Sequence, residues 1–115
     1  MSNVSWGRRA RYKFSAQGEL TRWSPPMVPG VFAITYRQEP EARPKSHTVL
    51  FFGQADDMSK QLANIDEGVC DFWSNSGGKN TDLYVFVYPM PGSTQYERTQ
   101  VQSQLISEYS PNANF

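Results

Sequence analysis

Residues 30–36 read GVFAITY and residues 48–53 read TVLFFG, and these two stretches decide the expected fold. Both are rich in β-branched and aromatic residues, which favour strands, here over residues 31–36 and 48–52. The segment between them holds Pro40, Pro44 and several charged residues, which is typical of a loop. We therefore expect two strands that pair antiparallel across a long loop.

Further along the chain, residues 83–88 read LYVFVY. This third strand is apolar on both faces, so we expect it at the centre of the sheet or well covered. Met58, Leu62 and Ile65 recur at helical spacing, after a pair of aspartates that suit a helix N-terminus. A second short helix is expected after Gly68.

The two ends of the chain add a helix and a hairpin. Thr94–Glu97 matches a capping box, which predicts the start of a last helix. Arg11–Phe14 alternates polar and aromatic residues, and Ala16–Gly18 is a turn signal, so we expect an N-terminal hairpin there. The apolar stripe of the last helix consists of Val101, Leu105, Ile106 and Tyr109.

These elements predict one α/β (α+β) domain, which suits a length of 115 residues. The expected core is a three-stranded antiparallel sheet flanked by helices, with the hairpin in front. We expect residues 1–27 to form a basic arm or hairpin packed on the domain, and residues 28–115 to form the domain itself.

The formal net charge is zero, which argues against a general nucleic-acid binder. The charge is uneven, because residues 1–22 hold five basic residues and one acid, and the rest is acidic. One cysteine, Cys70, and one histidine, His47, exclude a disulfide framework and a Cys/His metal cluster. We expect His47 to be an exposed loop residue. No apolar run is long enough for a membrane span or a secretory leader, so no membrane partner and a cytoplasmic location are expected.

Gly30–Phe32 opens the first strand and Phe51–Gly53 ends the second, and together they resemble the two halves of the signature of the GIY-YIG nuclease superfamily. Gln54–Leu62 resembles the stretch that follows the signature, where a polar cap opens the first helix. The likeness covers about residues 28–115 and rests on the order and spacing of these motifs. The family's terminal helix and closing asparagine are matched by Leu105, Ile106, Pro111 and Asn114.

The resemblance implies hydrolysis of a DNA phosphodiester bond by two tyrosines, an arginine and a glutamate that holds one divalent metal ion. At the matching positions this chain has Phe32, Phe51, Gln61 and Gln102. Phenylalanine has no hydroxyl to orient a water, and neutral glutamine can neither hold a metal strongly nor neutralise a phosphate. We therefore expect no catalytic residues, no metal and no cofactor. The chain is interpreted as a catalytically inactive GIY-YIG-like domain that acts as a binding or interaction module.

Two alternatives stay open. A divergent metal-dependent DNA endonuclease would need Mg²⁺ and a rewired site, for example with Lys60, Tyr84 or Glu97. A protein-interaction or assembly subunit needs no ligand site. For the inactive binding module, an exposed aromatic residue such as Trp73 could anchor a partner protein. The oligomeric state is open.

The expected ligand of the inactive module is a nucleic acid or a partner protein. For nucleic acid, the candidate phosphate-binding residues are Arg8, Arg9, Arg11, Lys13 and Lys60. Candidate stacking surfaces for bases are Trp6, Tyr12 and Phe14. If the four replaced family positions instead line an apolar pocket, a small molecule or peptide is favoured over nucleic acid.

Overall fold

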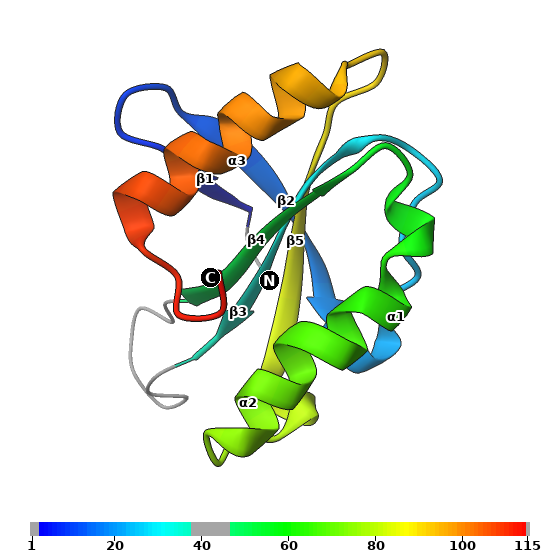
Figure 1. Cartoon of the computed structure of the whole chain (residues 1–115), viewed down its shortest axis with the longest axis vertical. Coiled ribbons are helices and arrows are strands. Elements are labelled where there is room, and N and C mark those ends of the chain that lie inside the picture. The colour runs from blue at the N-terminus through cyan, green and yellow to red at the C-terminus, as the bar shows by residue number, and fades with distance from the viewer. Residues whose placement is uncertain (1–2, 38–46, 115) are drawn as a thin grey trace.

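A computed structural model describes residues 3–37 and 47–114 of the chain (Figure 1). It is an α+β domain with one curled antiparallel sheet of five strands, in the order β1-β2-β5-β3-β4. The strands are β1 (Val4–Trp6), β2 (Tyr12–Glu19), β3 (Gly30–Tyr36), β4 (Thr48–Ala55) and β5 (Leu83–Pro89).

The strands predicted from the apolar stretches are confirmed. β3 pairs antiparallel with β4, from Gly30 opposite Ala55 to Tyr36 opposite Thr48. β5 lies between β2 and β3, so its central position is also confirmed. The predicted loop at residues 38–45 lies outside the described residues.

The sheet has five strands rather than the expected three, because the N-terminal hairpin belongs to it. The hairpin is formed by β1 and β2, and its turn is at residues 7–11 rather than at residues 16–18. Gly18 lies inside β2, where the pairing with β5 shifts register and the glycine has a φ of +95°. A glycine tolerates this conformation at a bulge, so the signal that predicted a turn marks a β-bulge.

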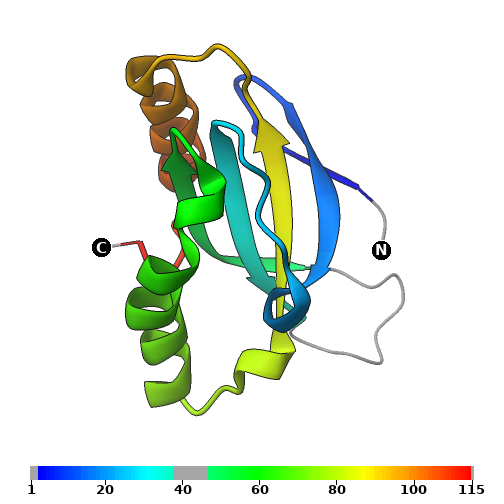
Figure 2. The ribbon, with the colours of Figure 1, turned by 90° about the vertical axis from the view of Figure 1, so that its right-hand side faces the viewer.

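Two helical regions pack on opposite faces of the sheet. Both lie on the side of the edge strand β4 (Figure 2). On one face lies the helical segment 62–75, which consists of α1 (Leu62–Ile65), the π-helical turn η3 (Asp66–Cys70) and α2 (Asp71–Asn75). On the other lies α3 (Gln95–Tyr109). Successive residues of β3 alternate between the faces, as a strand requires: Phe32 and Ile34 pack toward the helical segment, Val31 and Ala33 toward α3.

The start of α3 follows its sequence signal. Thr94 Oγ1 accepts a hydrogen bond from the Glu97 backbone N–H at 3.2 Å, and Glu97 Oε1 accepts one from the Thr94 N–H at 2.9 Å. The predicted capping box is thus confirmed. The expected second helix after Gly68 is not separate, because the π-helical turn η3 carries the chain through Gly68 into α2.

His47 is not the exposed loop residue that was predicted. Its side chain is half-buried, and its Nδ1 lies 2.9 Å from the hydroxyl of buried Thr35. Its ring packs edge-on against Tyr84 and Phe86. Burial, with a smaller contribution from the nearby charge of Arg37, lowers the pKa of His47 below its ordinary value.

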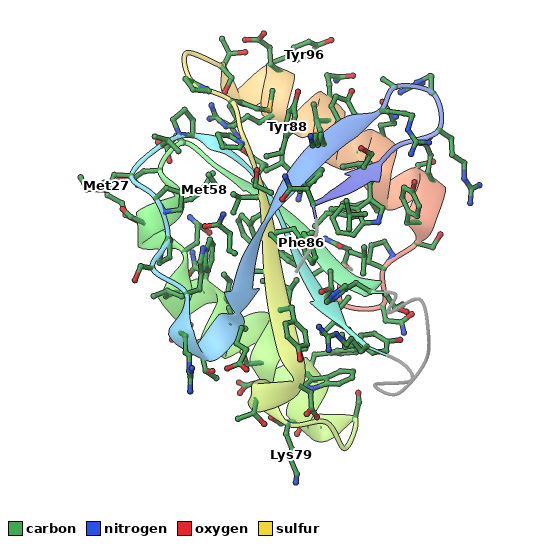
Figure 3. All side chains as sticks on the ribbon, turned by 180° about the vertical axis from the view of Figure 1, so that it is seen from behind. Met27, Met58, Lys79, Phe86, Tyr88 and Tyr96 are labelled. Atoms are coloured by element: carbon green, nitrogen blue, oxygen red, sulfur yellow. The ribbon has the colours of Figure 1, made fainter. Side chains whose placement is uncertain are left out.

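Among the described residues, the exposed large apolar side chains are those of Met27, Leu62 and Tyr96. Met27 and Tyr96 point away from the body, whereas Phe86 lies in the middle of the sheet (Figure 3). Among the described residues, no helix is both long enough and apolar enough to cross a membrane.

Candidate ligand pocket

The four residues that the GIY-YIG resemblance matches to catalytic positions line one cavity of about 260 Å³. Phe32 comes from β3, Phe51 from β4, Gln61 from the residue before α1, and Gln102 from α3. We call this the aromatic cavity. Its remaining lining residues are Gly53, Gln54, Asn64, Ile65, Gly68, Val69 and Ala113.

The position of the aromatic cavity follows from the edge strand β4. The helical segment 62–75 and α3 flank this strand from opposite faces, and both contribute lining residues (Figure 1). The C-terminal stretch adds Ala113, whose N–H donates to the Leu50 carbonyl at 2.9 Å. Segments that lie far apart in sequence therefore meet at one point of the sheet edge.

Aromatic rings line the cavity because a glycine leaves room for them. The rings of Phe32 and Phe51 lie 6.0 Å apart, and Phe32 is almost fully buried. Gly53 is directly opposite Phe32 in the β3–β4 register. A Cβ at position 53 would clash with both rings. This part of the lining is therefore apolar, and neither phenylalanine offers a hydroxyl to a water.

Gln102 has a defined task at the sheet edge. Its Nε2 donates to the Phe52 carbonyl at 2.9 Å, and Asn114 Nδ2 donates to the same carbonyl at 3.0 Å. The Phe52 N–H in turn donates to Asn114 Oδ1 at 2.8 Å. The two side-chain amides thus pair the exposed backbone of β4 as a neighbouring strand would.

These residues do not fit a divalent cation at the position that the GIY-YIG resemblance assigns to a metal. Gln102 is neutral, and its amide is already held by the Phe52 carbonyl. Across residues 3–37 and 47–114, no three His, Cys, Asp or Glu side chains gather closely enough to hold a metal ion. Such a hard cation prefers charged oxygen ligands.

A second, more polar cavity of about 240 Å³ adjoins the first and shares Gln54 and Gln61 with it. We call it the arginine cavity, because it contains Arg98 of α3, whose side chain is only 4% exposed. No sequence pattern pointed to Arg98. A single arginine in a polar helix start looks solvent-exposed, and its burial depends on β4, which is far away in sequence. The other residues that line this cavity are Ala55, Asp56 and Gln95.

The candidate phosphate-binding residues lie in two places. Arg8, Arg9 and exposed Arg11 are in the β1–β2 turn, and exposed Lys13 is in β2, so these four group at the hairpin. Lys60 is in the short helix η2 (Met58–Lys60). Met58 of this helix packs in the core on one face of the sheet, whereas Trp6 and Phe14 of the hairpin pack on the other. Lys60 therefore does not join the basic residues of the hairpin.

The hairpin turn is held against the C-terminal end of α3. The Glu108 carboxylate accepts hydrogen bonds from the backbone N–H groups of Arg8 at 2.8 Å and Arg9 at 3.2 Å. The Gln104 side chain also donates to this carboxylate, at 3.0 Å. Together these bonds lower the pKa of Glu108; the bond from Arg8 has the largest effect, followed by those from Gln104 and Arg9. The Arg8 guanidinium lies 5.6 Å from the centre of the Tyr109 ring. Part of the basic cluster is thus engaged within the fold.

The predicted stacking surfaces for bases are wrong for two of the three rings. Trp6 and Phe14 are buried in the core beneath α3, where their rings pack edge-on. Tyr12 is half-buried, and its hydroxyl donates to Gln104 Oε1 at 3.2 Å. Trp73 is also engaged, because its Nε1 donates to the Lys79 carbonyl at 2.8 Å.

The residues named for a rewired nuclease site line neither cavity. Lys60 is exposed on η2, and Glu97 is engaged in the capping box of α3. The bonds from Thr94 lower the pKa of Glu97. Tyr84 packs with the core beneath α3 and against the His47 ring. These three side chains do not converge on one site.

Comparisons of the chain with protein-family models, with curated proteins and with solved structures find no match. The two cavities and their residues are therefore the basis for a functional proposal.

Proposed function

We propose that the chain is a catalytically inactive GIY-YIG-like domain that acts as a binding module. Its ligand is a small molecule with an apolar group that enters the aromatic cavity. The residues that contact this group are Phe32 and Phe51 on the sheet and Ile65 and Val69 on the helical segment 62–75.

The convergence of four positions carries this proposal. By the sequence resemblance, Phe32, Phe51, Gln61 and Gln102 stand at the places where a GIY-YIG nuclease would have its catalytic groups. They come from separate elements, and all four line one cavity. A shared cavity is what an inherited site with changed residues would leave behind.

The chemistry of the lining favours binding over hydrolysis. Pockets for small molecules are concave and mainly apolar, with a few polar groups that orient the ligand. Here two phenylalanines supply the apolar surface, and amide side chains supply hydrogen bonds. The cavity volume of about 260 Å³ exceeds that of a dry cavity that holds a benzene, which is about 150 Å³. One ring with a short chain is a suitable occupant.

The basic hairpin supports nucleic acid less well. Arg8, Arg9, Arg11 and Lys13 still offer phosphate contacts, but Trp6 and Phe14 are buried and cannot stack on bases. Phosphate contacts alone give binding that depends steeply on salt and not on sequence. We therefore place the ligand in the aromatic cavity.

A titration with a neutral probe tests the proposal. Backbone amide NMR signals are followed while 3-phenylpropanamide is added. We expect saturable shifts of Gly53, Gly68 and Val69, which line the aromatic cavity. Unsaturable shifts, or shifts elsewhere on the surface, would contradict the proposal.

A blocking variant sharpens the test. Gly68→Leu adds a side chain at the cavity wall, and its Cβ meets no atom within 4 Å, so the fold should tolerate it. We expect this variant to lose probe binding. Ser103→Leu is the matched control, because Ser103 is exposed on α3 and lines neither cavity. Equal binding by both variants would place the probe outside the aromatic cavity.

A further inference from the structure

The guanidinium of Arg98 is buried with neutral partners. Its Nε donates to Gln54 Oε1 at 3.1 Å, and its Nη1 donates to the Ser93 carbonyl at 2.8 Å and to Ser93 Oγ at 3.0 Å. None of these acceptors is a carboxylate. A buried charge is costly unless an opposite charge or a strong set of hydrogen bonds compensates it.

In the part of the chain that the structure describes, no acid forms an ion pair with Arg98. The ion pair found there joins Arg22 to Glu19, at another place on the surface. Nη2 of Arg98 has no acceptor among the described residues. It is not fully buried either, unlike the unpartnered Trp23 Nε1 and Arg37 Nε. Its two N–H donors are therefore open to solvent, and Arg98 is one of the residues that line the arginine cavity.

The other walls of the arginine cavity also offer donors. Three of its lining residues are glutamines, Gln54, Gln61 and Gln95. Because Gln54 Oε1 accepts from Arg98, the amide of Gln54 is fixed and its Nε2 remains as a donor. One acid, Asp56, lines the cavity; it is exposed and lies beyond ion-pair distance from Arg98.

The arginine cavity and the aromatic cavity are neighbours that share Gln54 and Gln61. A ligand that spans both would place one end against a cationic donor group and the other against phenylalanine rings. We propose that the ligand of this site is a small carboxylic acid: its carboxylate binds Arg98, and its apolar body fills the aromatic cavity. This inference rests on the proposed function and specifies its ligand class.

The charges favour a carboxylate over a doubly charged phosphate group. A guanidinium binds a carboxylate through charge-assisted hydrogen bonds, and these are strong in a partly desolvated site. Asp56 on the exposed side repels any anion, and the repulsion is larger for a doubly charged group. A single negative charge next to an apolar group fits this balance.

Two probes of equal shape test the inference. 3-Phenylpropanoate carries the charge, and 3-phenylpropanamide is its neutral counterpart. We expect the acid to bind the unaltered protein about tenfold more tightly than the amide, as a charge-assisted hydrogen bond predicts. With Arg98→Gln, we expect this preference for the acid over the amide to disappear, because glutamine offers the carboxylate no positive charge.

Asp56→Asn provides a second variant that leaves the core intact. Because Asp56 is exposed, this change should not affect folding, and it removes the repulsion of the acid. We expect a gain of about twofold to threefold for 3-phenylpropanoate and none for the amide. An unchanged affinity for the acid would count against the inference even if Arg98→Gln fails to fold.

The outcomes separate the two proposals. Equal binding of acid and amide by the unaltered protein would overturn the inference and leave the proposed function standing. Binding of neither would overturn the proposed function, and with it the inference.

A third probe, N-acetylglycylphenylalanine, tests the source of the carboxylate. Tighter binding of this peptide than of 3-phenylpropanoate would show that the occupant is a peptide C-terminus, and the assignment to a small acid would be wrong.

Discussion

The ring of Phe32 covers Gly53 of the neighbouring strand so closely that no side chain can be placed at position 53. This contact sets the shape of the aromatic cavity, because both residues line it. We predict that Gly53→Ala lowers the free energy of unfolding by about 1–3 kcal/mol, the usual cost of overpacking a core. Chemical denaturation measures this change.

Gly68→Ala is the control for that prediction. Gly68 lines the same cavity, but an added Cβ there meets nothing within 4 Å. Its stability should stay the same or rise slightly, since alanine favours helical structure over glycine. If Gly53→Ala is as stable as Gly68→Ala, the contact between Phe32 and Gly53 is not as close as described.

Asn114 pairs with the edge of β4 through two hydrogen bonds to Phe52. We predict that Asn114→Ala destabilises the domain by about 1–3 kcal/mol, because it leaves backbone groups of Phe52 without this partner. Hydrogen exchange at the Phe52 amide should also become faster. Asn112→Ala, at an exposed neighbour, is the control and should change neither quantity. Unchanged exchange at Phe52 in the Asn114 variant would argue against this edge pairing.

His47 makes stability depend on pH. Burial first, and then the charge of Arg37, lowers its pKa below the ordinary value of 6.5, so the folded state favours the neutral ring. As pH falls through 6.5, the unfolded chain takes up a proton before the folded one does. The stabilisation is therefore complete above pH 6.5 and is lost as pH falls toward the lowered pKa.

Denaturation curves between pH 7.5 and about 5, the range in which a histidine ordinarily titrates, measure this effect. His47→Asn cannot titrate there, and we predict that its stability varies less over that interval. An equal pH dependence in both proteins would show that another group is responsible.

Glu108 fastens the β1–β2 turn to α3. Its carboxylate accepts from Arg8 and Arg9, and its pKa is lowered from the ordinary value of 4.5. The contribution of Glu108 to stability is therefore present above pH 4.5 and is lost as pH falls through the lowered pKa. We predict that Glu108→Gln speeds hydrogen exchange at the amides of Arg8 and Arg9 at neutral pH. Exchange as slow as in the unaltered protein would mean that the turn is held without the carboxylate.

Local signals in the sequence were enough for several elements. The apolar runs gave β3, β4 and the central β5, and Thr94–Glu97 gave the start of α3, because neighbouring residues determine each of these features. Gly18 was misread because a glycine with positive φ suits both a turn and a bulge. The choice between them depends on the pairing of β2 with β5, which no local pattern records.

The candidate site divides in the same way. Phe32 and Gln102 could be named from spacing, because they sit at fixed offsets from sequence motifs. Arg98 could not, since its burial arises from the contact with Gln54, 44 residues away. Trp6 and Phe14 were assigned to a ligand because an aromatic residue near arginines looks alike in a binding surface and in a core. The pairing of β1 with β2 decides that they belong to the core.

The location of a bound apolar probe tests the central claim most directly. Intermolecular nuclear Overhauser effects are measured between the ring protons of 3-phenylpropanamide and the methyl groups of the protein. The account predicts contacts to Ile65, Val69 and Ala113, whose side chains line the aromatic cavity. Contacts confined to residues outside this cavity, or none at a saturating concentration of probe, would contradict it.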